Sequence, residues 1–127
     1  AQLYPLRSWI DAGLRPIHSS DSPVISDARP LAAFATAMTR EDARGNVWGA
    51  DESISFAEAL AMTTTWAAQA SGAAQDRGRI KPGYLADFTV FDRDPGQVQP
   101  ADLAQVEPTM TIVGGDIAWR AGSDVGS

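Results

Sequence analysis

Cysteine is absent from this sequence of 127 residues, which excludes disulfides and thiolate metal sites but leaves the redox compartment open. Histidine occurs once, at His18. Basic residues are scarce as well: ten Lys and Arg stand against sixteen Asp and Glu, a formal net charge of −6, and no two basic residues are adjacent. Nucleic-acid backbones and anionic membrane surfaces bind basic patches, so we expect neither as a partner.

Long apolar runs are also missing. The longest, near residues 31–38, is interrupted by Thr36, so we expect no membrane-spanning segment. The first residues lack the basic-then-apolar pattern of a signal peptide, and they lack an initiating Met. We therefore expect a fragment of a longer protein whose location is unknown, with a soluble, cytoplasmic location slightly favoured.

The most informative stretch is residues 15–24, which predicts a short strand followed by a sharp turn. Residues 15–20 have the common length of a strand, and Pro16 suits a position near its start. Pro23 disfavours a helical conformation just before it, so the chain turns after Asp21. An acid at the C-terminal end of a strand is typical of the active sites of α/β barrels, which makes Asp21 the first candidate for a catalytic residue. Asp and Ser also turn chains and cap helices, so a structural Asp21 is the alternative.

Two helices are predicted after this turn. Apolar residues at helical spacing indicate one over residues 31–40, and Pro30 suits its first turn. A second helix, over residues 55–71, opens with a capping box made by Ser55 and Glu58 and ends just before a glycine.

The character of the sequence changes after the second helix, where β signals replace helical ones. Residues 86–91 alternate as a strand does, and Gly114 and Gly115 separate two further strand-like stretches as the turn of a hairpin. We therefore divide the chain into a helix–strand–helix part, residues 1–72, and a β-rich part, residues 73–127.

Several other polar residues have both a functional and a structural interpretation. If the strand alternates, His18 points away from Asp21, so we expect it to pack against helices rather than to bind a ligand. Ser19 or Ser20 would need a base on the same face to act as a nucleophile, and none is predicted there. We expect Asp87, Asp92 and Asp94 to be capping or solvated acids. We expect Arg40 and Arg44 to lie in a surface loop and Trp48 to cover the core, with a role in lining a substrate pocket as the alternative for all three.

Three pieces follow one another in an informative order. They are Ser-Asp-Ser-Pro-Val at residues 20–24, Arg-Gly-Arg-Ile-Lys-Pro-Gly-Tyr-Leu-Ala-Asp-Phe-Thr-Val-Phe-Asp at residues 77–92, and Thr-Ile-Val-Gly-Gly at residues 111–115. In this order they resemble the C-terminal end of the metal-dependent amidohydrolases, in particular the amidohydrolase-3 group with its formamide deformylase-like and YtcJ-like members. The most specific part of the resemblance is residues 78–92.

The resemblance implies a fold class as well as a site. Residues 15–20 would be the last strand of a (β/α)8 barrel, residues 31–40 and 55–71 would be barrel helices, and residues 73–127 would form part of a small β-sandwich. Asp21 would be the catalytic acid at the end of that strand, holding a divalent metal, with zinc the expected ion, or its bound water. In that family the acid accepts the proton of the attacking water.

The same resemblance implies hydrolysis of C–N bonds in small amide-type substrates, either non-peptide amides or cyclic amides. The family's other metal ligands, which include a His-X-His pair, have no counterpart in a chain with one histidine. We therefore expect no metal on this chain alone and no activity of the isolated chain. Its main partner would be the remainder of the barrel.

A free-standing, non-catalytic α+β interaction module is the alternative function. The two interpretations differ in the apolar surface that they predict. A barrel fragment leaves Ile17, Phe34, the apolar stripe over residues 56–67, Phe88 and Val90 without their neighbours. We expect such a fragment to form homo-oligomers through this exposed surface.

Overall fold

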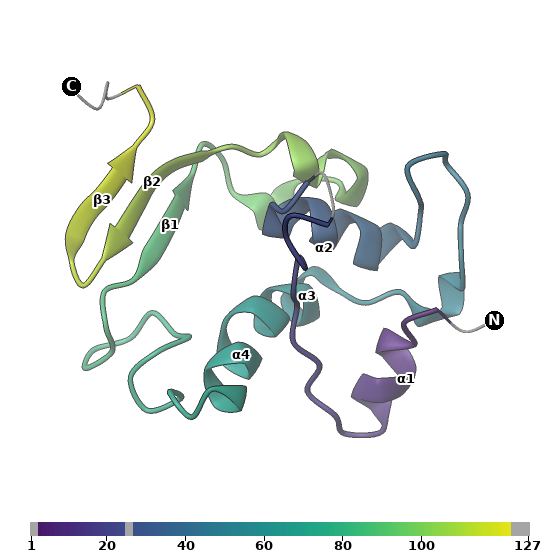
Figure 1. Ribbon diagram of the computed structural model, residues 1–127, viewed down its shortest axis with the longest axis horizontal. Coiled ribbons are helices and arrows are strands. Elements are labelled where there is room, and N and C mark those ends of the chain that lie inside the picture. Colours follow the sequence, from purple (N-terminus) through teal and green to yellow (C-terminus); the bar gives the residue numbers. More distant parts are fainter. Residues whose placement is uncertain (1–2, 25–26, 123–127) are drawn as a thin grey trace.

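The structure is a computed structural model that describes residues 3–24 and 27–122. Helices and the loops that connect them form most of the molecule, and a three-stranded sheet stands at the left end in Figure 1. The helices, with η denoting a 3-10 helix, are α1 (Leu6–Asp11), α2 (Pro30–Thr39), η1 (Ala50–Glu52), α3 (Phe56–Thr63), α4 (Thr65–Ala70), η2 (Pro95–Gln97) and η3 (Pro100–Gln105). The strands are β1 (Phe88–Phe91), β2 (Pro108–Val113) and β3 (Asp116–Arg120).

One apolar core holds the helices together. Helix α2 packs against η3 and α3, and Leu103 of η3 is fully buried there. The rings of Phe34 and Phe56 meet edge to face with their centroids 5.9 Å apart. The core therefore takes side chains from both residues 1–72 and residues 73–127. The division of the chain into these two parts stays a prediction. Its buried members are Leu6, Leu31, Phe34, Ile54, Ala59, Met62, Leu103 and Val106.

Strands β2 and β3 form the hairpin that the two glycines predict. Gly114 and Gly115 have φ values of +60° and +93°, a left-handed conformation that costs little without a Cβ. Strand β1 pairs antiparallel with β2, which gives the sheet order β1-β2-β3.

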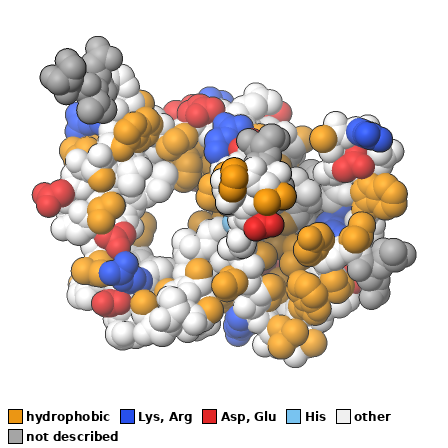
Figure 2. Space-filling model, in the orientation of Figure 1, with side chains coloured by type: hydrophobic (Ala, Val, Ile, Leu, Met, Phe, Trp, Pro, Cys, Tyr) orange, Lys and Arg blue, Asp and Glu red, His pale blue; other side chains and the backbone are white. Residues whose placement is uncertain are grey.

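The register gathers apolar residues on one face of this sheet. Phe88 lies opposite Ile112, Val90 opposite Met110, and Ile117 opposite Ile112 on the other side. None of these is fully buried, and Val90 and Ile117 are 41% and 52% exposed. Figure 2 shows hydrophobic side chains on this end of the molecule as well as over the helices. The apolar face of the sheet is therefore only partly covered in the described chain.

The predicted exposure of apolar residues is confirmed only in part. Ile17 is 51% exposed and Leu60, on the stripe of α3, is 43% exposed. The expectation for Phe34 is wrong, because it is only 3% exposed. Its neighbours come from within the chain: α2 is covered by η3 and α3.

The single helix predicted over residues 55–71 is two helices in the structure. It opens with the predicted capping box, in which Ser55 and Glu58 each satisfy a backbone N–H of the other. The helix breaks at Thr64, whose φ and ψ are −123° and −91°. The hydroxyls of Thr63 and Thr64 donate to the carbonyl of Leu60, at 3.0 and 2.7 Å. Side-chain bonds of this kind compete with the helical bonds of the backbone, and the β-branched run adds to the break.

Residues 15–20, expected to form a strand, pair with no strand in the described parts of the chain. The one backbone hydrogen bond that joins them to the helices runs from the His18 N–H to the Met62 carbonyl, at 3.2 Å. A strand needs a neighbour that accepts and donates along its length, and the described sheet, of order β1-β2-β3, does not include residues 15–20. The segment is therefore an irregular connection between α1 and α2.

Candidate active site

Asp21 lies at the turn that follows residues 15–20, about midway between α1 and α2. Its N–H donates to the hydroxyl of Ser19 at 3.3 Å, and the N–H of Val24 donates to its carbonyl at 2.9 Å. Its φ is +50°, a left-handed conformation that is strained for residues other than glycine, although Asp tolerates it better than most. The Asp21 side chain is exposed. The structure thus presents one carboxylate to solvent on a tight turn.

His18, three residues earlier, packs between helices. It is half-buried and borders a small cavity with Ala33, Phe34, Ala37, Ala59 and Met62. Burial lowers the pKa of His18, which favours the neutral ring. These contacts agree with the predicted packing role.

The described residues do not fit a complete metal centre. A catalytic zinc site takes about three protein ligands. Across residues 3–24 and 27–122, no three His, Asp or Glu side chains form a group that could hold a metal ion. Asp21 is therefore a single carboxylate without further ligands from the described chain.

The loop residues that sequence offered as alternatives have structural roles. Arg40 is buried, and its guanidinium donates to the carbonyls of Trp48, Gly49 and Leu3 at 3.1, 3.3 and 2.6 Å. Trp48 does not cover the core: its side chain is 54% exposed, and its indole N–H donates to Asp42 at 2.9 Å. This bond and others from the same loop hold the pKa of Asp42 well below its usual range. Hydrogen bonds to the Asp42 carboxylate hold the loop, and Trp48 does not pack into the core.

The three candidate acids singled out in the β-rich part bind backbone groups, as predicted for capping residues. Asp87 accepts the N–H of Gly114 at 2.8 Å, and Asp94 accepts the N–H of Gly96 at 2.8 Å. Asp92 accepts the N–H of Glu107 at 3.2 Å.

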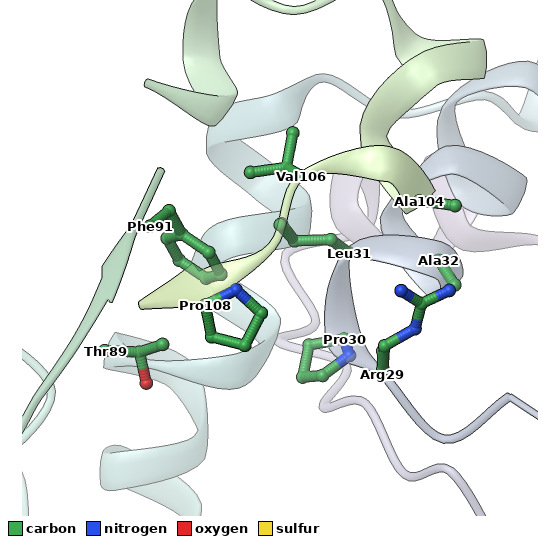
Figure 3. Close-up of a pocket in the computed structure, with 9 residues that line it drawn as sticks. All are labelled: Arg29, Pro30, Leu31, Ala32, Thr89, Phe91, Ala104, Val106 and Pro108. Carbon is green, nitrogen blue, oxygen red and sulfur yellow. The ribbon is translucent and has the colours of Figure 1, made fainter. Parts of the chain in front are cut away.

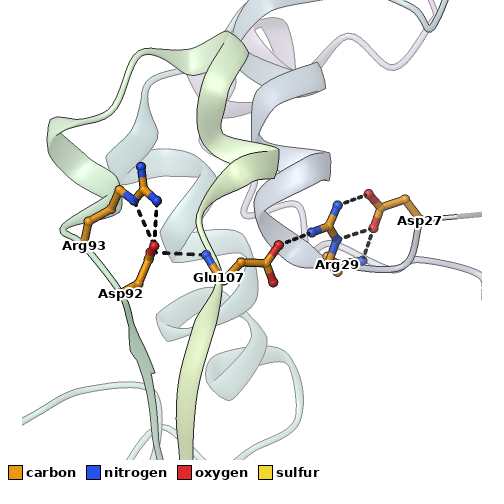
Figure 4. Close-up of polar contacts among 5 residues, drawn as sticks. All are labelled: Asp27, Arg29, Asp92, Arg93 and Glu107. Atoms are coloured by element: carbon orange, nitrogen blue, oxygen red, sulfur yellow. Dashed lines mark hydrogen bonds and ion pairs between the residues drawn. The ribbon is translucent and has the colours of Figure 1, made fainter. Parts of the chain in front are cut away.

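A chain of ion pairs joins the start of α2 to the start of β2, as Figure 4 shows. Arg29 holds Asp27 with two parallel bonds of 2.9 and 2.8 Å and reaches Glu107 at 3.2 Å. The Arg29 guanidinium lowers the pKa of Asp27 to about 2. Asp92 is paired with Arg93 at 2.6 Å, and this bond lowers its pKa. No spacing rule indicates the Arg29–Glu107 pair, because these residues are 78 positions apart, whereas the other two pairs join near neighbours in the sequence.

An apolar hollow of about 140 Å³ lies beside these ion pairs, between α2, β1 and the η3–β2 connection (Figure 3). Polar side chains in its lining are limited to Arg29 and Thr89, and the guanidinium of Arg29 is already bound to Asp27 and Glu107. The hollow therefore brings no catalytic groups together. Its lining residues are Arg29, Pro30, Leu31, Ala32, Thr89, Phe91, Ala104, Val106 and Pro108.

None of the helices within the described ranges has the length and apolar character needed to cross a bilayer. This finding agrees with the absence of long apolar runs in the sequence.

Comparison with known proteins gives the family. The profile of the Amidohydrolase family matches residues 1–118. N-substituted formamide deformylase of Arthrobacter pascens is 36% identical over 123 residues, which are 96% of this chain and 22% of that protein. The protein YtcJ of Bacillus subtilis (strain 168), provisionally named an amidohydrolase, is 30% identical over 117 residues, which are 90% of this chain and 22% of YtcJ.

A solved structure has the same fold over most of the chain. It is an amidohydrolase from Thermotoga maritima MSB8, which matches with a TM-score of 0.65 over 87% of this chain and 24% of that chain, at 22% identity. The chain spans less than a quarter of the length of each of these three proteins. The match of the family profile over residues 1–118 means that the chain belongs to the amidohydrolase family.

Proposed function

We propose that this chain works as the C-terminal segment of a larger amidohydrolase that cleaves C–N bonds in small, non-peptide or cyclic amides. The observation that carries the proposal is the family match over residues 1–118, a range that includes the Asp21 turn. The name of the Arthrobacter pascens relative, N-substituted formamide deformylase, supports N-substituted formamides as the first substrates to test. A soluble, cytoplasmic location remains part of this proposal.

Asp21 is the residue to which we assign chemistry. Its carboxylate is exposed within the α1–α2 connection, where a substrate held by another part of the protein can reach it. As a general base, an Asp21 oxygen takes the proton of the water that attacks the carbonyl carbon, and returns a proton to the leaving nitrogen. The ligands of the divalent metal that such enzymes use, zinc being the expected ion, would otherwise come from outside this chain.

The uncovered surfaces of the chain support a role as part of a barrel and a sandwich. Within the described chain residues 15–20 pair with no strand, and neighbouring strands of a barrel would supply that pairing. The apolar face of the sheet, with Val90 and Ile117 exposed, has the pattern of a sandwich layer that packs on a second layer. In this proposal both neighbours belong to the remainder of the same protein.

The experiment that tests this function is Asp21→Asn in the full-length protein. We expect its kcat on N-substituted formamides and cyclic amides to fall by about 100-fold or more, because the base is lost while the shape of the side chain is kept. Amine release measures the rate, and circular dichroism and thermal unfolding measure the fold.

Asp116→Asn is the matched control, since Asp116 is an exposed acid at the start of β3. It should keep the wild-type rate. A wild-type rate in Asp21→Asn would remove Asp21 from the mechanism, and a wild-type protein that cleaves none of these amides would overturn the proposed substrate class.

A further inference from the structure

The segment that carries Asp21 has few attachments to the rest of the molecule. Between residues 15 and 24, the hydrogen bond from His18 N–H to the Met62 carbonyl, at 3.2 Å, is the one bond to another element in the described chain. A second contact places the Arg15 guanidinium 5.4 Å from the centroid of the Trp66 ring. The other bonds of Asp21, to Ser19 and Val24, lie within the segment itself.

His18 combines this backbone bond with a side chain that enters the helical layer. The half-buried His18 lines a residual cavity of about 20 Å³ together with Ala33, Phe34 and Ala37 of α2 and Ala59 and Met62 of α3. These five residues carry no titratable group, so the ring is held by shape and apolar contact. Helix α2 begins nine residues after Asp21.

The geometry points to His18 as the positioning residue for Asp21, an inference that rests on the proposed function. The His18 side chain anchors the segment between α2 and α3. The backbone hydrogen bond to the Met62 carbonyl fixes the position of the segment along α3. The turn that follows then sets where the Asp21 carboxylate emerges. Because reaction rates fall steeply when a base is displaced by even about 1 Å, the anchored position of this segment affects turnover.

Two variants in the full-length protein test the inference. His18→Ala removes the ring, and we expect hydrogen exchange at residues 18–24 to accelerate by about tenfold or more while α2 and α3 keep their protection. We expect kcat on N-substituted formamides to fall by about tenfold or more with KM changed by less than about threefold. His18→Phe keeps a planar ring, for which the residual cavity leaves room, and should restore both readouts.

Val106→Ala is the matched control, since Val106 is a buried core residue that does not border the His18 cavity. It should lower thermal stability while leaving exchange at residues 18–24 and kcat near wild type. Equal losses in Val106→Ala would overturn the inference by reducing His18 to ordinary core packing. A His18→Phe variant that keeps protection but loses turnover would also overturn it, because the ring nitrogens would then take part.

The exchange measurement separates this inference from the proposed function. If the wild-type protein cleaves no amide, the proposed function fails, and exchange at residues 18–24 still decides whether His18 fixes the segment. Unchanged exchange in His18→Ala overturns the positioning role whatever the activity.

Discussion

The carboxylate of Glu52 accepts the backbone N–H of Ser8 at 2.8 Å and also the Ser8 hydroxyl, across 44 residues of sequence. Helix α1 has no capping bond from the residue before it, Pro5, so a buried acid from η1 takes the place of a local cap. The two bonds from Ser8 lower the pKa of Glu52. This pair, together with Arg40, which donates to the Leu3 carbonyl, ties the start of the chain to the 40–52 loop.

We predict that Glu52→Gln lowers the thermal midpoint by several degrees. The carboxylate of Glu52 accepts the two Ser8 bonds with its two oxygens, whereas the glutamine amide has only one acceptor oxygen. The substitution also removes the negative charge near buried Arg40. Glu41→Gln is the control, because Glu41 is exposed. Equal midpoints in the two variants, measured by circular dichroism, would contradict the prediction.

We predict that Ser55→Ala lowers the free energy of unfolding by about 1 kcal/mol, the usual contribution of an N-cap side chain. The Ser55 hydroxyl accepts the N–H of Glu58 at 3.3 Å and donates to the Glu58 carboxylate at 2.8 Å. Ser53→Ala, two residues earlier and outside the capping box, should change stability little. Urea denaturation of both variants measures their free energies of unfolding. Superimposed denaturation curves would contradict the prediction.

The features that sequence predicted well depend on residues close together in the chain. The capping box of Ser55 and Glu58 spans three residues, and the β2–β3 hairpin depends on two adjacent glycines that tolerate positive φ. The Asp21 turn also follows from local chemistry, because Pro23 and the short polar side chains around it disfavour a regular element.

The features that sequence did not predict depend on distant partners. The pairs Ser8–Glu52 and Arg29–Glu107 join segments 44 and 78 residues apart, and no spacing rule indicates them. The strand expected at residues 15–20 has no neighbour to pair with in the described chain, and the burial of Phe34 results from packing against η3. At each of these places the outcome depends on tertiary partners that the local pattern does not specify.

We predict that Leu103→Ala lowers the free energy of unfolding by about 2–5 kcal/mol, since Leu103 is 0% exposed at the junction of η3 and the helical core. Leu60→Ala removes the same atoms from a side chain that is 43% exposed, and it should cost much less. If residues 73–127 were a domain with a separate core, Leu103→Ala would leave the melting of α2 and α3 unchanged. Hydrogen exchange in those helices checks this outcome.

We predict that stability decreases as the pH falls below the ordinary His pKa of 6.5, because of His18. Burial lowers its pKa, so in this range the unfolded chain takes up a proton at His18 that the folded chain does not. The contribution of His18 to stability is complete above its pKa in the unfolded chain and is lost as the pH falls through its pKa in the folded chain. Urea denaturation of wild type and His18→Phe at about pH 7.5 and pH 5.5 measures the difference. The variant should lose less stability over this window, and equal losses would mean that His18 is not the group responsible.

We predict that Gly78→Ala destabilises the protein more than Gly72→Ala does. Both glycines have left-handed φ values, +81° and +73°, so alanine is strained at both by about 1–2 kcal/mol. They differ in their surroundings: a Cβ at Gly78 would lie 2.8 Å from the Thr64 carbonyl oxygen and 2.9 Å from the Cβ of Ala68, whereas nothing lies within 4 Å of one at Gly72. Moving the loop away from α4 should cost a further 1–3 kcal/mol or so, as overpacking does elsewhere. Equal free energies of unfolding for the two variants would mean that the loop after α4 yields without resistance, and that only the backbone conformation makes glycine necessary at Gly78.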